Sequence, residues 1–337
     1  MNPQSYALML ILLCSSAPSL AAGVEKLYPV KKGGKYGYVD HNGTVVVPIE
    51  LDWAVEFYER RGTFGKSRNQ VGVLDAKGRV TFTLEVEALL PFSNDRALIC
   101  HGFTTVGFVN ERGEPVIAEH DVAAQVGAKS VHLTSFSDGL AAFGAGGRTG
   151  FIDTNGRVVI APRYSSAGHF SEGLCPVEFN GRWGCIDKSG RLVIEAEYEH
   201  VSSPSDSVIV AKTKGQSWLL LSLDGQSIGE VHAKNVLPFS VGFAPIQDKG
   251  GKWGFIGKNG KLQIRSQFDE VLWFSNGLAP VKVDGRWGYI DTESRVVIQP
   301  KFLEAHPHDI NGVAWVRTAA GHGYINLKGD FVWTPQM

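Results

Sequence analysis

Three short patterns in the chain contain residue types that are used in catalysis or metal binding. Residues 144–150 are rich in glycine, as phosphate-binding loops are, but they lack the Lys-Ser/Thr pair of a nucleotide loop and lie between two strand-like runs. His306 and His308 flank one proline, and two histidines without a third ligand are a weak signal for a metal site. The third pattern is a set of aspartates that recur once per repeat, which we interpret as turn residues: Asp40, Asp75, Asp153, Asp187 and Asp291.

Motifs of the common hydrolases are also missing from the sequence. It contains neither a Gly-x-Ser-x-Gly nucleophile elbow nor a His-Glu-x-x-His pair. We therefore expect a protein that is not an enzyme and that has no catalytic residue, no cofactor and no metal.

Four tryptophans lie outside the regular positions of the repeat described below, namely Trp53, Trp273, Trp315 and Trp333. Tryptophan is enriched at the energetic centres of protein interfaces, although each of these side chains would equally fill a gap in a core. We take the four as candidate binding residues.

Two cysteines, Cys175 and Cys185, flank the turn Asn180-Gly181. With a two-residue loop, Cys175 opposes Ile186 and Cys185 points to the other face of the hairpin. With a three-residue loop that ends in a glycine bulge, the two cysteines face each other and can form a disulfide. The sequence leaves both arrangements open.

The chain repeats itself about every 35 residues. The steps between equivalent positions are 34 or 35 residues, apart from one step of 43, and eight of the nine positions are glycine. A second glycine follows six residues later in eight of the nine repeats, with Ser294 as the exception. Such a period is typical of a repeat architecture. The nine anchor positions are Gly37, Gly72, Gly107, Gly150, Gly184, Leu219, Gly254, Gly288 and Gly323.

Each repeat has the pattern of a three-stranded antiparallel meander followed by a connector. In the fifth repeat, residues 174–179 and 182–186 are apolar runs joined by Asn-Gly, which is a strong hairpin signal. A second turn and a third run follow, and Pro48, Pro162 and Pro300 are expected to close the third run. The connector carries an aromatic residue in several repeats: Tyr164, Tyr198, Phe268 and Phe302.

The segments at residues 181–190, 251–260 and 285–291 have the form Gly-Arg/Lys-Trp-Gly-x-Ile, and most repeats are preceded by Phe-Ser-x-Gly-Leu-Ala or a variant of it. In these residues the chain resembles the WG-repeat (KWG-repeat) family of bacterial proteins. The resemblance covers the chain from about residue 24 to residue 337. It implies an exported repeat protein that acts as an interaction module, and it carries no catalytic residue to transfer.

One meander of this size buries too little apolar surface to be stable, so the repeats must pack against one another. We predict an all-β fold of about nine three-stranded units in an open superhelical array, with a closed propeller-like ring as the alternative. The long step contains an insertion near residues 119–133, where residues 121–125 suggest one or two turns of helix. Insertions of this kind form either a binding face or a tolerated surface loop.

Composition and the first residues of the chain bear on its location and partners. Lys plus Arg is 33 and Asp plus Glu is 34, and this near-zero net charge argues against a nucleic-acid partner. Residues 1–22 contain a short apolar run and then Ser19-Leu20-Ala21, which predicts a signal peptide cleaved after Ala21 or Ala22. We therefore expect residues 23–337 to form one WG-repeat domain, periplasmic or secreted, monomeric and without a transmembrane span.

These features favour a non-enzymatic module that binds another protein. A more specific hypothesis, by analogy only, is an inhibitor or immunity protein for a secreted toxin such as a lipase effector. The alternative is an envelope- or carbohydrate-binding protein whose tryptophans outside the repeat stack on sugar rings.

Overall fold

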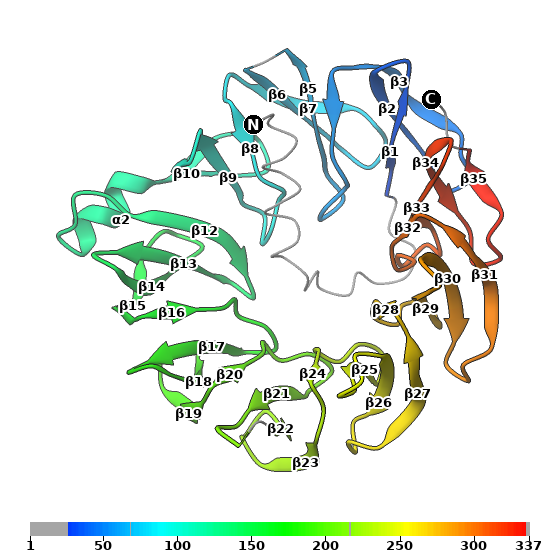
Figure 1. Ribbon diagram of the computed structural model, residues 1–337. Coiled ribbons are helices and arrows are strands. Elements are labelled where there is room, and N and C mark those ends of the chain that lie inside the picture. Colours follow the sequence, from blue (N-terminus) through cyan, green and yellow to red (C-terminus); the bar gives the residue numbers. More distant parts are fainter. Residues whose placement is uncertain (1–25, 68, 216, 335–337) are drawn as a thin grey trace. The chain divides into compact units, whose positions relative to one another are not determined.

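The computed structural model describes residues 26–67, 69–215 and 217–334, which form short antiparallel strands and one short helix (Figure 1). The predicted signal peptide, residues 1–22, lies outside the described residues. The chain divides into two compact units. One holds the residues up to Ser171 and the turn Lys188–Gly190, and the other holds Glu172–Asp187 and the chain from Arg191 onward.

The first unit contains four sheets and the first strand of a fifth. We call each sheet a blade and number the blades along the chain. The strands are β1 (Tyr28–Lys32), β2 (Lys35–Val39) and β3 (Val45–Leu51); β4 (Trp53–Ala54), β5 (Gly62–Ser67), β6 (Gln70–Leu74) and β7 (Val80–Leu84); β8 (Ala88–Leu89), β9 (Ala97–His101), β10 (Thr104–Val109) and β11 (Pro115–Ala118); β12 (His132–Ser137), β13 (Leu140–Ala145), β14 (Arg148–Asp153) and β15 (Val158–Tyr164); and β16 (Ser166–Ala167).

The second unit contains the rest of the fifth blade and the sixth to ninth blades. Its strands are β17 (Leu174–Phe179), β18 (Arg182–Asp187) and β19 (Leu192–Tyr198); β20 (His200–Val201), β21 (Ile209–Lys212), β22 (Trp218–Leu221) and β23 (Ser227–Val231); β24 (Asn235–Val236), β25 (Phe243–Gln247), β26 (Trp253–Gly257) and β27 (Leu262–Phe268); β28 (Glu270–Val271), β29 (Leu278–Val283), β30 (Arg286–Asp291) and β31 (Val296–Phe302); and β32 (Glu304–Ala305), β33 (Ala314–Thr318), β34 (Gly321–Ile325) and β35 (Phe331–Trp333).

The prediction of an all-β repeat protein with nine units is confirmed, but the predicted number of strands per unit is wrong. Eight of the nine sheets formed by the described residues have four strands, and only the first has three. The additional strand is two residues long in most blades and comes from the segment that we interpreted as a connector. A four-stranded antiparallel meander is the blade of a β-propeller, so the blades of each unit fit the propeller-like alternative better than an array of three-stranded units.

The recurring aspartates form turns, as predicted, and they do so in the same way in the five blades that have them. In the second blade, the Asp75 carboxylate accepts hydrogen bonds from the backbone N–H groups of Lys77 and Arg79, both at 2.9 Å. Three residues after Asp75, Gly78 has a φ of 76°, a left-handed conformation that favours glycine. The side chain and the glycine together close the turn between the third and fourth strands of the blade.

In six blades the anchor glycine allows the outer strand to approach the third strand closely, whereas at Gly72 the nearest atoms belong to the Phe64 ring. In the eighth blade Trp287 opposes Phe302 and Tyr289 opposes Ile298, so residues 299–301 form a bulge in β31. A Cβ atom on Gly288 would lie 2.5 Å from the Ile298 carbonyl oxygen, closer than any side chain tolerates. Pro300 lies inside this bulge, where no ladder hydrogen bond is required of it, rather than at the end of the strand as predicted.

The one anchor position that is not glycine, Leu219, lies in a blade whose outer strand has no such bulge. In the sixth blade the outer strand β23 has five residues instead of seven, and its pairing with β22 is regular at this point: Leu219 opposes Glu230 and Leu220 opposes Gly229. Without the bulge, no backbone group approaches the anchor position, and a leucine side chain is accommodated there.

Consecutive blades share their hydrophobic cores. Trp287, Tyr289 and Phe302 of the eighth blade pack against Ala314, Val316 and Ile325 of the ninth. Equivalent shared cores join the first four blades in the first unit and the fifth to eighth blades in the second. Each blade therefore covers its neighbour, as a repeat protein requires.

The insertion in the fourth repeat forms the helix α2 (Glu119–Gln125), which confirms the predicted helical segment. Val122 and Ala123 are buried in the core of the third and fourth blades. The Gln125 amide donates to the Gly156 carbonyl at 2.8 Å and accepts from the Val158 N–H at 2.9 Å. The helix thus packs against the core and caps the start of β15.

Candidate binding surface

A group of exposed apolar side chains lies on the first strands and first turns of the seventh, eighth and ninth blades. We call it the first-strand patch; its members are Leu237, Val241, Trp273 and Ile310, whose side chains are 39%, 57%, 41% and 39% exposed. Trp273 is one of the four predicted binding residues. The other three members were missed by the sequence analysis.

Hydrogen bonds between consecutive blades hold the members of the patch near one another. The Ser240 hydroxyl donates to the Phe274 carbonyl at 2.8 Å, which places Val241 beside the segment that carries Trp273. The Ser275 hydroxyl donates in the same way to the carbonyl of His308, two residues before Ile310. These serines belong to the recurring Phe-Ser-x-Gly pattern, so the repeat itself builds the support of the patch.

Val241 is unusual in conformation as well as in exposure. Its φ is 52°, in the left-handed region that a β-branched residue rarely adopts. A residue held in such a conformation stores backbone strain, and strain of this kind clusters at functional sites.

Most other blades have a polar residue at the position of Val241, whereas the ninth has Ile310, and in several of them the polar side chain binds the next turn. The Asn94 side chain accepts a hydrogen bond from the Gly139 N–H at 2.9 Å, and the Glu172 carboxylate accepts one from the Ser207 N–H at 2.9 Å. Val241 cannot make such a bond. This departure from the Phe-Ser-x-Gly pattern is the sequence signal that would have identified the patch.

The remaining three candidate tryptophans are not brought together with Trp273. Trp53 lies on β4 opposite Gly65 and packs against the core of the second and third blades. Trp315 lies between two histidine rings, with centroid distances of 4.7 Å to His306 and 4.9 Å to His322. Trp333 lies on β35 opposite Tyr324 and is half-buried. Their use in binding stays a prediction.

The tryptophans of the repeat itself serve in packing between blades. Trp218 and Trp287 are buried, and each lies under a lysine side chain, Lys212 at 5.6 Å and Lys282 at 5.7 Å from the ring centroid. Both contacts are cation–π interactions. The Lys282 ammonium also forms an ion pair with Glu270 at 2.7 Å.

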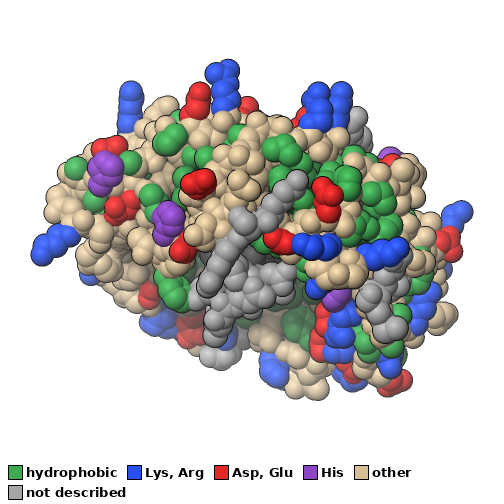
Figure 2. Space-filling view, turned by 90° about the horizontal axis from the view of Figure 1, so that it is seen from above, with side chains coloured by type: hydrophobic (Ala, Val, Ile, Leu, Met, Phe, Trp, Pro, Cys, Tyr) green, Lys and Arg blue, Asp and Glu red, His purple; other side chains and the backbone are tan. Residues whose placement is uncertain are grey.

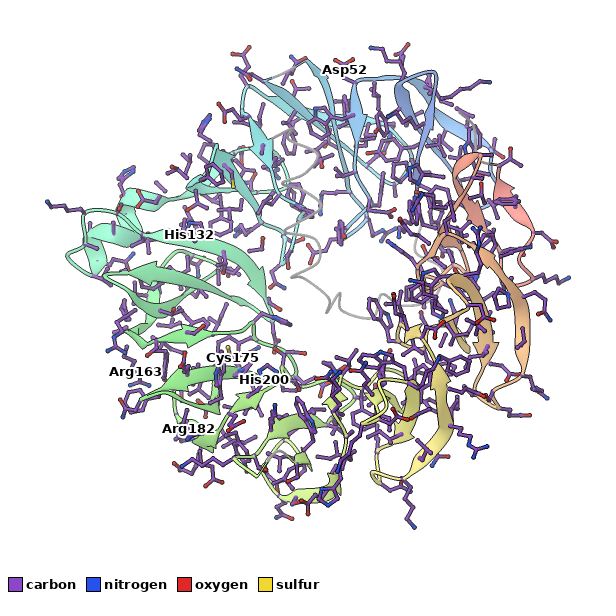
Figure 3. The ribbon with its side chains drawn as sticks, viewed as in Figure 1. Asp52, His132, Arg163, Cys175, Arg182 and His200 are labelled. Atoms are coloured by element: carbon purple, nitrogen blue, oxygen red, sulfur yellow. The ribbon has the colours of Figure 1, made fainter. Side chains whose placement is uncertain are left out.

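The hairpin of the fifth blade has the two-residue loop, with Asn180 and Gly181 both at positive φ. Cys175, labelled in Figure 3, opposes Ile186, and Cys185 opposes Pro176. The two sulfurs therefore lie on opposite faces of the sheet. No disulfide joins them, and of the two arrangements weighed above the two-residue loop is the one observed. Burial raises the pKa of the Cys185 thiol to about 12, which keeps it protonated and unreactive.

The other patterns of the sequence analysis have structural roles. Residues 144–150 form the ends of β13 and β14 and the turn between them. His308 is buried, with its Nε2 3.1 Å from the Asn326 carbonyl oxygen, whereas His306 is exposed. Among the described residues, no group of three or more His, Cys, Asp or Glu side chains is placed to hold a metal ion.

Two further features describe the surface. Figure 2 shows charged side chains of both signs projecting from the face that it displays, in agreement with the near-zero net charge. None of the helices in the described part of the chain has the length and apolar character needed to cross a bilayer.

Comparison with known proteins identifies the repeats of this chain. A family model described as "WG containing repeat" matches residues 36–59, 150–183, 183–218, 253–287 and 287–318. The chain therefore carries WG-containing repeats, as its resemblance to that family predicted. A search of the curated proteins found no match.

Solved structures of low sequence identity resemble this chain to different degrees. A crystal structure titled as that of the eukaryotic initiation factor has 10% identity and a TM-score of 0.62, and the match covers 91% of this chain and 94% of that one. The computationally designed Ika8 protein has 14% identity and a TM-score of 0.49, with 82% and 93% covered. BamB from Moraxella catarrhalis has 12% identity and a TM-score of 0.44, with 83% and 95% covered. At these identities the first of the three shows a likeness of fold and nothing about function.

Proposed function

We propose that the protein is a binding module for another protein and that the partner docks on the first-strand patch. The observation that carries the proposal is Val241, an exposed and strained valine where most other blades have a polar turn residue. A soluble surface has little reason to keep such a residue unless it is covered in a complex. Trp273 adds a large aromatic surface of the kind found at interface hot spots.

The geometry favours a protein partner over a carbohydrate. Sugar binding by stacking requires an aromatic ring with an open face. Among the four candidate tryptophans the rings of Trp53 and Trp315 are packed against neighbours, Trp333 is half-buried, and only Trp273 is exposed. A single exposed ring beside three aliphatic side chains suits an apolar protein surface better.

Affinity capture with the tagged full chain tests this proposal. The wild type is compared with the double variant Val241→Asn, Trp273→Ser, in which asparagine restores the residue type found at Asn94 and Asn276. The matched control is Val296→Ser, Val297→Ser, which removes a similar exposed apolar area from β31. We expect a partner that is retained by the wild type and the control and is lost with the patch variant. Equal retention by all three proteins would refute the docking site.

Export is a separate proposal, supported by the apolar run and the small residues near Ala21. We expect the mature chain recovered outside the cytoplasm to begin at Ala22 or Gly23, as measured by intact mass. The narrower hypothesis of a toxin inhibitor is checked by challenging a deletion strain with the toxin encoded nearby. A deletion strain that tolerates the toxin would end that hypothesis.

A further inference from the structure

A cavity of about 460 Å³ lies between the sixth and seventh blades, within the second unit. Its apolar lining comes from Val231 of the sixth blade and from Ile246, Ile256 and Leu262 of the seventh. Its charged lining consists of Glu230 and Asp248 together with Arg265, and His232 also borders it. We call it the 6–7 groove.

The groove lies where the sixth blade departs from the repeat. In blades with a seven-residue outer strand, the last residue of that strand opposes the residue before the anchor, and in four of them it is aromatic: Tyr164, Tyr198, Phe268 and Phe302. In the sixth blade the same position, opposite Trp218, is held by Val231. The sixth blade therefore lacks an aromatic ring that other blades place against their neighbour.

A second side chain is missing from the same face of the blade. Gly229 opposes Leu220, a position at which the eighth blade has the buried Ile298 and the fifth has the buried Ile194. A Cβ built on Gly229 would meet no atom closer than 3.5 Å, which is ordinary van der Waals contact. The Asn259 backbone of the seventh blade and the Leu220 side chain already lie in contact with this position, so the open volume is that of the groove beside Val231.

In two of the blades that have the aromatic residue at this position, a basic side chain lies over its ring. The Arg163 guanidinium lies 5.0 Å from the centroid of the Tyr164 ring (Figure 3), and the Lys301 ammonium lies 5.1 Å from the centroid of the Phe302 ring. In the other two blades with this aromatic, Glu197 precedes Tyr198 and Gln267 precedes Phe268. A basic residue followed directly by an aromatic one is therefore one of the combinations that the repeat places beside an outer strand.

The charges of the groove are complementary to such a pair. Neither Glu230 nor Asp248 forms an ion pair with a lysine or arginine among the described residues; the one ionic neighbour of Glu230 is His232, at 4.0 Å. Arg265 lines the groove with one positive charge, and the Lys252 ammonium lies near enough to Asp248 to interact with it. The Asp248 carboxylate also accepts a hydrogen bond from the Lys252 N–H at 2.9 Å. A cation that enters with an aromatic ring would be attracted to Glu230 and Asp248.

We propose that the 6–7 groove is a second binding site, which accepts a Lys/Arg-Phe/Tyr pair from an extended segment of a partner protein. The aromatic ring fills the volume next to Val231 that other blades fill from their own chain. The basic side chain lies toward Glu230 and Asp248. The site is independent of the first-strand patch.

The probe is the peptide acetyl-Gln-Pro-Lys-Phe-amide, the sequence of residues 299–302, titrated into the full chain. Binding is followed by NMR through the methyl groups of Val231, Ile246, Ile256 and Leu262. We expect saturable shifts of these methyl groups. Affinity should fall at least tenfold when alanine replaces phenylalanine, and severalfold when glutamate replaces lysine. Equal binding of the alanine peptide would overturn the proposal.

Two variants of the protein test whether the peptide binds in the 6–7 groove. Val231→Phe restores the repeat aromatic in the chain itself and is expected to weaken binding at least tenfold, whereas Val283→Phe, on the exposed hairpin of the eighth blade, leaves it unchanged. Asp248→Asn is expected to weaken binding of the Lys-Phe peptide severalfold but not that of a Gln-Phe peptide. Unchanged binding by a folded Val231→Phe protein would also refute the site, whatever the result of the capture experiment on the first-strand patch.

Discussion

Glycine at the anchor position is required by a contact with the backbone of the outer strand. We expect Gly288→Ala to lower the free energy of unfolding by about 2–3 kcal/mol, because the new methyl group would press on the Ile298 carbonyl and the bulge would have to move. Urea unfolding measures the change. Gly144→Ala is the control, since a Cβ there meets nothing within 4 Å, and it should change stability by less than about 0.5 kcal/mol. Similar losses for both variants would contradict the role of the bulge.

Ser294 is the one residue that is not glycine at the second recurring glycine position, and replacing it by glycine should stabilise the protein. Ser294 has a φ of 66° in a turn where the equivalent residues are glycines. We expect Ser294→Gly to raise the free energy of unfolding by about 0.5 kcal/mol, because glycine adopts this conformation without a steric cost. The melting temperature should rise slightly as a result. The gain is partly offset by the greater freedom of glycine in the unfolded chain. A lower melting temperature would show that the serine side chain has a role of its own.

At this scale the sequence predicted the turns correctly. Asp75 and Gly78 do what their types and spacing indicate, because a turn is determined by a few neighbouring residues. The register of the Cys175 hairpin could not be decided, since the two loop lengths differ only in local geometry. The first-strand patch was missed although Val241, at a position that is polar in most blades, was a signal for it, because the exposure of its members depends on packing between blades.

The serine that begins each first turn links one blade to the next. We expect Ser240→Ala to destabilise the protein by about 1 kcal/mol, since the Phe274 carbonyl loses its 2.8 Å hydrogen bond. Chemical denaturation measures this loss. Ser165→Ala serves as a control, because that hydroxyl accepts only an exposed bond from Arg148. An effect of Ser240→Ala no larger than that of the control would show that these serines do not stabilise the contact between blades.

The elements were predicted in part. The second to fourth strands of each blade follow from their alternating pattern and their turns. The first strand was missed because two residues, such as Glu270 and Val271, are too few to show any periodicity. The seven-residue outer strands were read as three-residue runs ended by proline, because a bulge that contains Pro300 looks the same as a strand that stops there.

Stability of the whole molecule should depend on pH through buried histidines. Burial lowers the pKa of His308 from its ordinary value of 6.5, and it also lowers the pKa of the half-buried His169. Each group is neutral in the folded chain and takes up a proton more readily when unfolded, so stability present above about pH 6.5 is lost as the pH falls below it. Each histidine contributes a slope of at most about 1.4 kcal/mol per pH unit.

His308 occupies the position that Phe274 has in the preceding blade, so His308→Phe is the natural comparison. We expect this variant to fold and to lose less stability than the wild type between pH 6.5 and pH 5, as measured by thermal unfolding at a series of pH values. Exposed His120, changed to phenylalanine or glutamine, is the control and should leave the pH dependence as it is. Identical pH profiles of the wild type and His308→Phe would exclude a contribution from His308.

The shared cores have a consequence for how such a chain changes in length. One face of a blade packs against the opposite face of the next, and the side chains on each face are of the same kind from blade to blade. A duplicated repeat would therefore meet complementary surfaces on both sides, and so would the two ends left by a deleted one. Unequal recombination between repeats can then alter the number of blades without new contacts having to evolve, and variation in repeat number among related genes is the expected record of it.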